Sequence, residues 1–138
     1  MRIAVVDGQG GGMGKALVEK IRDALGSQVE IIALGTNALA TAAMLKAGAD
    51  EGATGENAIV VNASRADYIL GSVGIISANS MLGELTPRMA AAIAESPARK
   101  ILIPFNRCGV FIAGTREEPP AKYIEEAAGI LKTMIAAK

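Results

Sequence analysis

The chain has no histidine, no tryptophan and a single cysteine, Cys108, among its 138 residues. One cysteine excludes an internal disulfide and suits a reducing cytoplasm. The side chains that usually hold zinc are almost entirely missing, which leaves a carboxylate-bound Mg²⁺ as the metal that the composition permits. The sequence therefore predicts neither a disulfide scaffold nor a zinc site.

The chain also lacks an excess of charge of either sign, since 14 Lys and Arg balance 14 Asp and Glu. Without a basic run, the electrostatic footprint of a nucleic-acid-binding protein is absent. Two Tyr and two Phe are too few for a platform on which bases stack. No stretch reaches the roughly 18 apolar residues of a membrane-spanning helix. We therefore expect neither nucleic acid nor membrane as a partner, and a cytoplasmic location.

Apolar residues are abundant. Hydrophobic residues make up 51% of the chain, and there are 16 glycines, which together exceed the share typical of a soluble domain. The length fits one domain over residues 1–138. Parallel strands buried on both faces would use part of the apolar excess. An interface between copies would use more, so we expect a homodimer or larger homo-oligomer.

Short apolar runs alternate with helical patterns along the chain. Strands are expected at residues 3–6, 29–34, 68–70 with a continuation past Gly71, 100–103 and 110–113. Helices are expected at residues 15–25, 38–47, 56–63, 87–95 and from 119 onward. Thr86 and Pro87 form a clear helix start. Residues 50–55 carry two glycines and are expected to form a loop.

This alternation predicts an α/β fold: a single three-layer Rossmann-like domain with a mostly parallel sheet of about five strands and helices on both faces. In such sheets, ligands bind at the carboxyl ends of the strands. That rule selects four segments rich in Gly, Ser, Asn or Thr: residues 8–14, 35–37, 72–80 and 106–109.

The first of these segments has five glycines between Gly8 and Gly14 and lies between a buried strand and an amphipathic helix. Glycines admit a ligand to the bare backbone, and the helix N-terminus favours an anion, so a phosphate or pyrophosphate is the expected guest. The alternative is that the glycines serve only a tight turn and close packing. The candidate binding residues here are Asp7, Gly8, Gln9, Gly10, Gly11, Gly12, Met13, Gly14 and Lys15.

Two of these residues have alternative roles. Asp7 could tether the loop through backbone N–H groups, which we favour, or it could contact a ribose or a metal. Lys15 could balance phosphate charge or simply lie exposed on the helix.

The spacing G-x-x-x-G-x-G at Gly8, Gly12 and Gly14 resembles the cofactor loop of the short-chain dehydrogenases, with Asp7 where that family usually has threonine. The resemblance covers about the first third of the chain and implies NAD or NADP as cofactor. It does not extend to the family's Tyr-x-x-x-Lys pair, because no lysine follows either tyrosine at that spacing.

The run Gly11 to Lys15 resembles the variant phosphate loop of the chromosome-partitioning ATPases. Gln9 stands at the leading glycine position, and Ala16 replaces the Ser or Thr whose hydroxyl holds Mg²⁺. Hydrolysis of a nucleoside triphosphate is therefore not expected.

The other three segments supply polar candidates. Thr36 and Asn37 could donate to a ribose or phosphate, although Asn37 could equally cap the next helix. With no carboxylate or arginine in residues 35–37, the choice between NAD and NADP stays open. Ser72, Asn79 and Ser80 would lie across the crevice from the glycine loop, and Ser80 could equally cap a turn at residues 81–84.

After the fourth strand, Asn106 and Cys108 are the candidates. Arg107 beside Cys108 could lower the pKa of its thiol and make it reactive. The alternative is a small buried apolar group, because a lone cysteine without a histidine base is most often that.

The opening Asp-Gly-Gln-Gly-Gly-Gly and the segment Ala78–Pro87 resemble a family of short bacterial proteins of unknown function over nearly the full length. This resemblance implies the fold and a bacterial cytoplasmic origin but no activity. We expect a binding or sensor subunit for a phosphate-bearing nucleotide or dinucleotide. The alternatives are an NAD(P)-dependent oxidoreductase, whose site is completed by oligomerisation or a partner, and a structural subunit without ligand.

Overall fold

The computed structural model describes residues 1–105 and 109–138, which form one five-stranded sheet. The strands, all parallel, are β1 (Arg2–Asp7), β2 (Glu30–Gly35), β3 (Glu51–Thr54), β4 (Tyr68–Ser72) and β5 (Arg99–Ile103). The helices are α1 (Gly12–Leu25), α2 (Ala38–Ala47), α3 (Glu56–Ala63), α4 (Pro87–Glu95) and α5 (Pro120–Ala136). Short 3₁₀ turns are η1 (Gly26–Gln28), η2 (Val73–Ile76) and η3 (Met81–Gly83).

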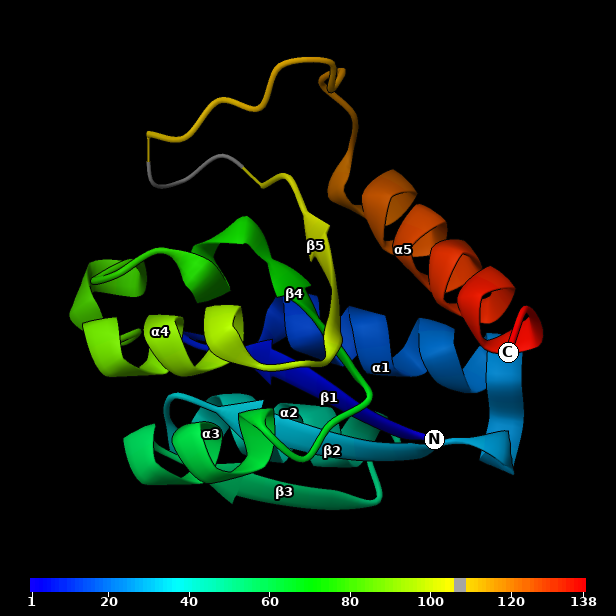
Figure 1. The fold of residues 1–138 in the computed structure, drawn as a ribbon, viewed down its shortest axis with the longest axis horizontal. Helices are drawn as coiled ribbons and strands as arrows, with labels where there is room; N and C mark the ends of the chain where they lie inside the picture. Colours follow the sequence, from blue (N-terminus) through cyan, green and yellow to red (C-terminus); the bar gives the residue numbers. More distant parts are fainter. Residues whose placement is uncertain (106–108) are drawn as a thin grey trace.

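The sheet has helices on both faces, and the strand order is β3-β2-β1-β4-β5. Alternate residues of each strand point to opposite faces. Ile3 and Val5 pack in the cluster that includes residues of α1, α2 and α5. Ala4 and Val6 pack in the cluster formed with α3 and α4. Figure 1 shows α5 lying beside α1, away from α3 and α4. The predicted three-layer Rossmann-like fold is confirmed.

Local signals explain why several elements begin and end where the sequence predicts. The Asn37 side chain accepts a hydrogen bond of 2.8 Å from the Ala40 amide and caps the start of α2, and Gly48 is the C-cap that follows its last residue. The Thr86 hydroxyl accepts from the Met89 amide at 3.2 Å and caps α4. The choice of a helix for residues 56–63 is also confirmed.

The expectation of a loop at residues 50–55 is wrong, because Glu51–Thr54 is the edge strand β3, paired with Ile32–Gly35 of β2. Gly52, one of the two glycines that suggested a loop, instead allows close packing between this strand and a helix. A Cβ at Gly52 would lie 2.8 Å from Cγ2 of Thr41 and 2.9 Å from Cδ1 of Leu45, so glycine lets α2 lie close against this strand.

The expected strand at Val110–Ala113 is also wrong, since these residues form no regular structure. A parallel neighbour for β5 needs a crossover of about a dozen residues, whereas only residues 104–109 separate Ile103 from Val110. The segment stays exposed, and Phe111 is 84% exposed. The sheet therefore has about five strands as expected, but with β3 in place of this segment.

Candidate functional site

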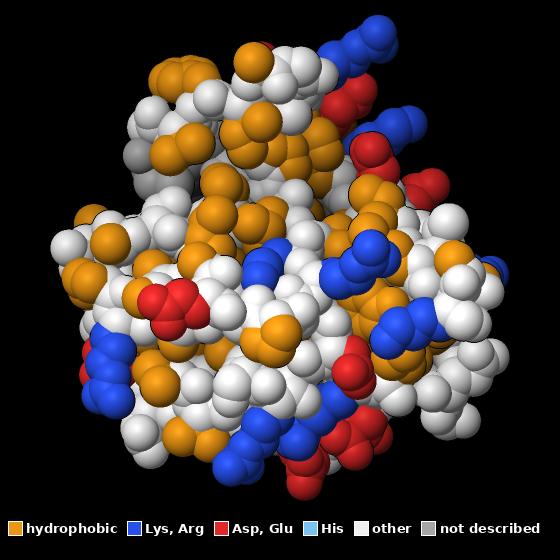
Figure 2. Space-filling model, in the orientation of Figure 1, with side chains coloured by type: hydrophobic (Ala, Val, Ile, Leu, Met, Phe, Trp, Pro, Cys, Tyr) orange, Lys and Arg blue, Asp and Glu red, His pale blue; other side chains and the backbone are white. Residues whose placement is uncertain are grey.

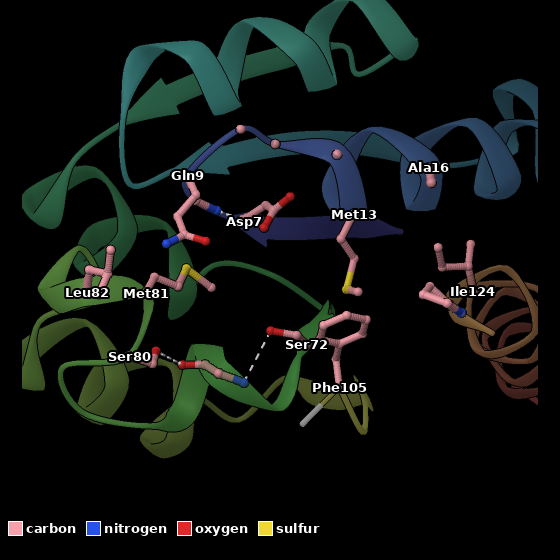
Figure 3. Close-up of a pocket in the computed structure, with 16 residues that line it drawn as sticks. Asp7, Gln9, Met13, Ala16, Ser72, Ser80, Met81, Leu82, Phe105 and Ile124 are labelled. Carbon is pink, nitrogen blue, oxygen red and sulfur yellow. Dashed lines mark hydrogen bonds between the residues drawn. The ribbon is translucent and has the colours of Figure 1, made fainter. Parts of the chain in front are cut away.

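A cavity of about 660 Å³ lies at the carboxyl edge of the sheet, where the strand order reverses between β1 and β4. The loop that joins β1 to α1 forms one wall (Figure 3). Ser72 and Ser80 lie opposite (Figure 3), and Gly74 also lines the cavity. Met81 and Leu82 lie at one end and Ile124 at the other, while the Met13 side chain points toward Phe105. This is the position at which doubly wound sheets bind their ligands.

Asp7 holds the glycine loop at the end of β1. Its carboxylate accepts hydrogen bonds from the backbone amides of Gly8, at 2.8 Å, and Gly14, at 2.6 Å. Burial raises the pKa of Asp7 and outweighs these two bonds, which lower it; the nearby charge of Glu84 also raises it. The tether that the sequence favoured for Asp7 is the arrangement that forms.

Three glycines of the loop are required by the fold. A Cβ at Gly8 would lie 2.5 Å from Oγ1 of Thr36, and one at Gly14 would lie 2.6 Å from Sδ of Met44. Gly11 has φ +75°, in the left-handed region that favours glycine, and its Cβ would lie 2.8 Å from the backbone of α2. For these three positions, the turn-and-packing interpretation of the glycines holds.

Gly10 and Gly12 differ from the other three. A Cβ at either position would meet no atom of residues 1–105 or 109–138 within 4 Å, and neither residue has a left-handed φ. Both line the cavity. Among the described residues, the backbone N–H groups of Gly10, Gly12 and Met13 donate to no protein acceptor. Because α1 begins at Gly12, two of these amides belong to its first turn, where the helix dipole is positive.

Glu84, which the sequence analysis did not nominate, joins three elements at the other side of the loop. Its Oε1 accepts hydrogen bonds from the Gln9 amide at 2.8 Å, from Oγ1 of Thr36 at 2.7 Å and from Nδ2 of Asn37 at 2.8 Å. The bond from Gln9 is the largest of the causes that lower the pKa of Glu84. Thr36 and Asn37 therefore bind a protein carboxylate and do not line the cavity.

Residues 79–84, here called the strap, carry Glu84 to that position. Asn79, Met81 and Leu82 have φ of +65°, +57° and +56°, conformations that are costly for residues other than glycine. The Ser80 hydroxyl donates to the Gly74 carbonyl at 2.5 Å and makes no capping bond to the turn that follows it. Leu82 is 96% exposed, so burial of its side chain does not explain its backbone conformation.

Of the remaining residues predicted from the sequence, some line the cavity and others do not. Ser72 lines the cavity and accepts a hydrogen bond from the Gly74 amide. Lys15 borders a hollow between α1 and α2 and, like Gly14 and Asn79, is not part of the cavity lining. Asn106 and Cys108, with Arg107 between them, lie outside the described residues. The structure thus brings most of the glycine loop, Ser72 and Ser80 together around one space.

Two other features bear on function. In residues 1–105 and 109–138, no group of three or more His, Cys, Asp or Glu side chains is placed to hold a metal ion. None of the helices in the described part of the chain combines the length and the hydropathy needed to span a bilayer.

Among the comparisons with known proteins, only the comparison with protein families gave a match. The chain matches no curated protein and no solved structure. A family model described as a domain of unknown function, DUF3842, matches residues 2–136. The resemblance to an uncharacterised family that was stated from the sequence is thereby confirmed. With nearly its whole length matched, the chain belongs to the DUF3842 family.

Proposed function

We propose that this protein binds a phosphate-bearing nucleotide in the cavity between β1 and β4, as a small binding or sensor subunit. One observation carries the proposal: the fold does not require glycine at Gly10 or Gly12, yet both present open backbone to the cavity. The amides of Gly10, Gly12 and Met13 have no acceptor in the part of the protein that the structure describes. A phosphate would satisfy them and meet the positive end of the α1 dipole.

The rest of the cavity suits the remainder of a nucleotide. Its volume of about 660 Å³ lies within the range of roughly 300–1,000 Å³ usual for small-molecule sites. Met13, Phe105 and Ile124 offer apolar surface for a base, while Ser72 offers a polar contact. No lysine or arginine is among the described lining residues, so amides and the helix dipole would carry phosphate recognition.

A thermal-shift screen against NAD, NADP, AMP, ATP, FAD and FMN tests the proposal. A ligand at 100 times its dissociation constant should stabilise the protein by about 2.7 kcal/mol. Gly12→Val should abolish the shift, because its side chain would block approach to the backbone. Gly129→Val is the matched control, since Gly129 lies in α5 with equally open surroundings and outside the cavity. No shift with any nucleotide, or an undiminished shift in Gly12→Val, would contradict the proposal.

We also propose that the protein forms a homodimer or larger assembly. Val110, Phe111 and Ile112 are consecutive apolar residues with exposures of 37%, 84% and 42%, and hydrophobic side chains gather in the upper half of the face shown in Figure 2. Exposed apolar patches are typical of interaction surfaces. Light scattering at micromolar concentration should give a mass above 14.1 kDa; a monomer mass would refute this.

A further inference from the structure

The carboxyl edge of the sheet has two halves that differ in the space they offer. The half above β1, β4 and β5 holds the cavity. The half above β1 and β2 holds the Glu84 carboxylate with its three donors. In sheets of this strand order, a dinucleotide spans both halves, and the ribose of its adenosine lies at the end of the second strand. What fills the second half therefore bears on the class of ligand.

In the half at β2, side chains pack closely around Gly8. The position of a Cβ on Gly8 lies within 2.5 Å of Oγ1 of Thr36, 2.7 Å of Sδ of Met81 and 3.1 Å of Oε1 of Glu84. Neither Thr36, Asn37 nor Glu84 borders the cavity. A second nucleoside would have to displace Glu84, and its donors would lose a carboxylate that accepts all three hydrogen bonds.

Negative charge, like close packing, disfavours a ligand in the β2 half. Glu84 lies close enough to Asp7 to disfavour ionisation of the Asp7 carboxyl. A 2′-phosphate such as that of NADP, which would lie at the end of β2, would bring a further negative charge beside both carboxylates. The amides of Gly10, Gly12 and Met13, by contrast, donate to no acceptor among the described residues and could donate to a phosphate group.

From this arrangement, and resting on the proposed function, we infer that the ligand is a mononucleotide rather than a dinucleotide, and that Glu84 is the residue that determines this preference. The phosphate would lie on the free amides and the nucleoside in the cavity, while Glu84 closes the β2 half. The left-handed residues of the strap are consistent with this role, because strained backbone is common where a segment clamps a binding site.

Isothermal titration calorimetry with two sets of probes tests the inference: AMP, GMP, CMP, UMP and FMN against NAD, NADP and FAD. In the parent protein, the tightest mononucleotide should bind at least about tenfold more tightly than any dinucleotide. Glu84→Ala should reduce that ratio by tightening dinucleotide binding, because it opens the β2 half. Glu84→Gln, which keeps the volume and an oxygen acceptor, should retain most of the preference.

Each result has one meaning. If no nucleotide of either set binds, the proposed function fails. If a dinucleotide binds the parent protein as tightly as the best mononucleotide, the function stands and this inference is overturned. Weaker dinucleotide binding in Glu84→Ala would also overturn it, because Glu84 would then be a ribose contact. The ratio in the parent protein decides the inference even if Glu84→Ala does not fold.

Discussion

Replacing Gly14 and Gly12 separately by alanine should have opposite effects on stability. A Cβ at Gly14 would lie 2.6 Å from Sδ of Met44 and 2.8 Å from Cβ of Asp7, and overpacking of this kind costs about 1–3 kcal/mol. A Cβ at Gly12 would have no neighbour within 4 Å among the described residues, and alanine is favoured over glycine within helices by about 0.5–1 kcal/mol. We expect Gly12→Ala to unfold with a free energy about 1.5–4 kcal/mol above that of Gly14→Ala.

Urea unfolding followed by circular dichroism measures this difference. With a denaturant slope of about 1–3 kcal/mol/M, the two unfolding midpoints should differ by roughly 0.5 M or more. Gly12→Ala should in addition lose nucleotide binding while Gly14→Ala, where folded, exposes no new side chain to the cavity. Equal stability of the two variants, or a loss above about 1 kcal/mol in Gly12→Ala, would refute the division of the loop into packing glycines and ligand-facing glycines.

Three further predictions concern other sites. Because the pKa of Glu84 is lowered from 4.5, its contribution to stability is present above that value and lost as the pH falls through the lower folded value; unfolding midpoints in this acid range should therefore fall less steeply in Glu84→Gln than in the parent. Gly129 lies in the middle of α5, on its exposed side, so Gly129→Ala should raise the unfolding free energy by about 0.5–1 kcal/mol. A decrease would refute the claim that a side chain at this position has open space around it. Leu82→Gly removes a 96% exposed side chain from a left-handed position, so denaturation should show a gain between zero and about 1 kcal/mol; a clear loss would indicate that Leu82 makes a stabilising contact.

Much of the fold could be predicted from the sequence, because its signals are local. Buried strands such as Ile3–Val6 are continuous apolar runs, and α2 is capped by Asn37 at its start and by Gly48 after its last residue. The edge strand β3 could not be recognised, since its residues are mostly exposed and one is a glycine whose purpose is contact with α2. The strand expected at Val110–Ala113 was predicted from apolar composition alone. Apolar composition does not provide the neighbouring strand with which such a segment must pair.

The candidate site was predicted less completely. Topology alone locates the carboxyl edge and therefore the glycine loop, Ser72 and Ser80. Glu84 could not be found, because its hydrogen bonds join residues 47 to 75 positions apart and leave no local pattern. The same contacts explain why Thr36 and Asn37 face Glu84 instead of the cavity. Which glycines pack and which face open space also depends on neighbours that are distant in sequence.

Binding of a phosphate by the backbone amides of the glycine loop is the central claim, and nuclear magnetic resonance can observe those amides one by one. The protein should be titrated with the tightest mononucleotide from the binding screen while amide shifts are recorded. We predict that the resonances of Gly10, Gly12 and Met13 move most, and that those of Gly8 and Gly14, already bonded to Asp7, move less. Saturable binding that leaves Gly10, Gly12 and Met13 unmoved would contradict the account.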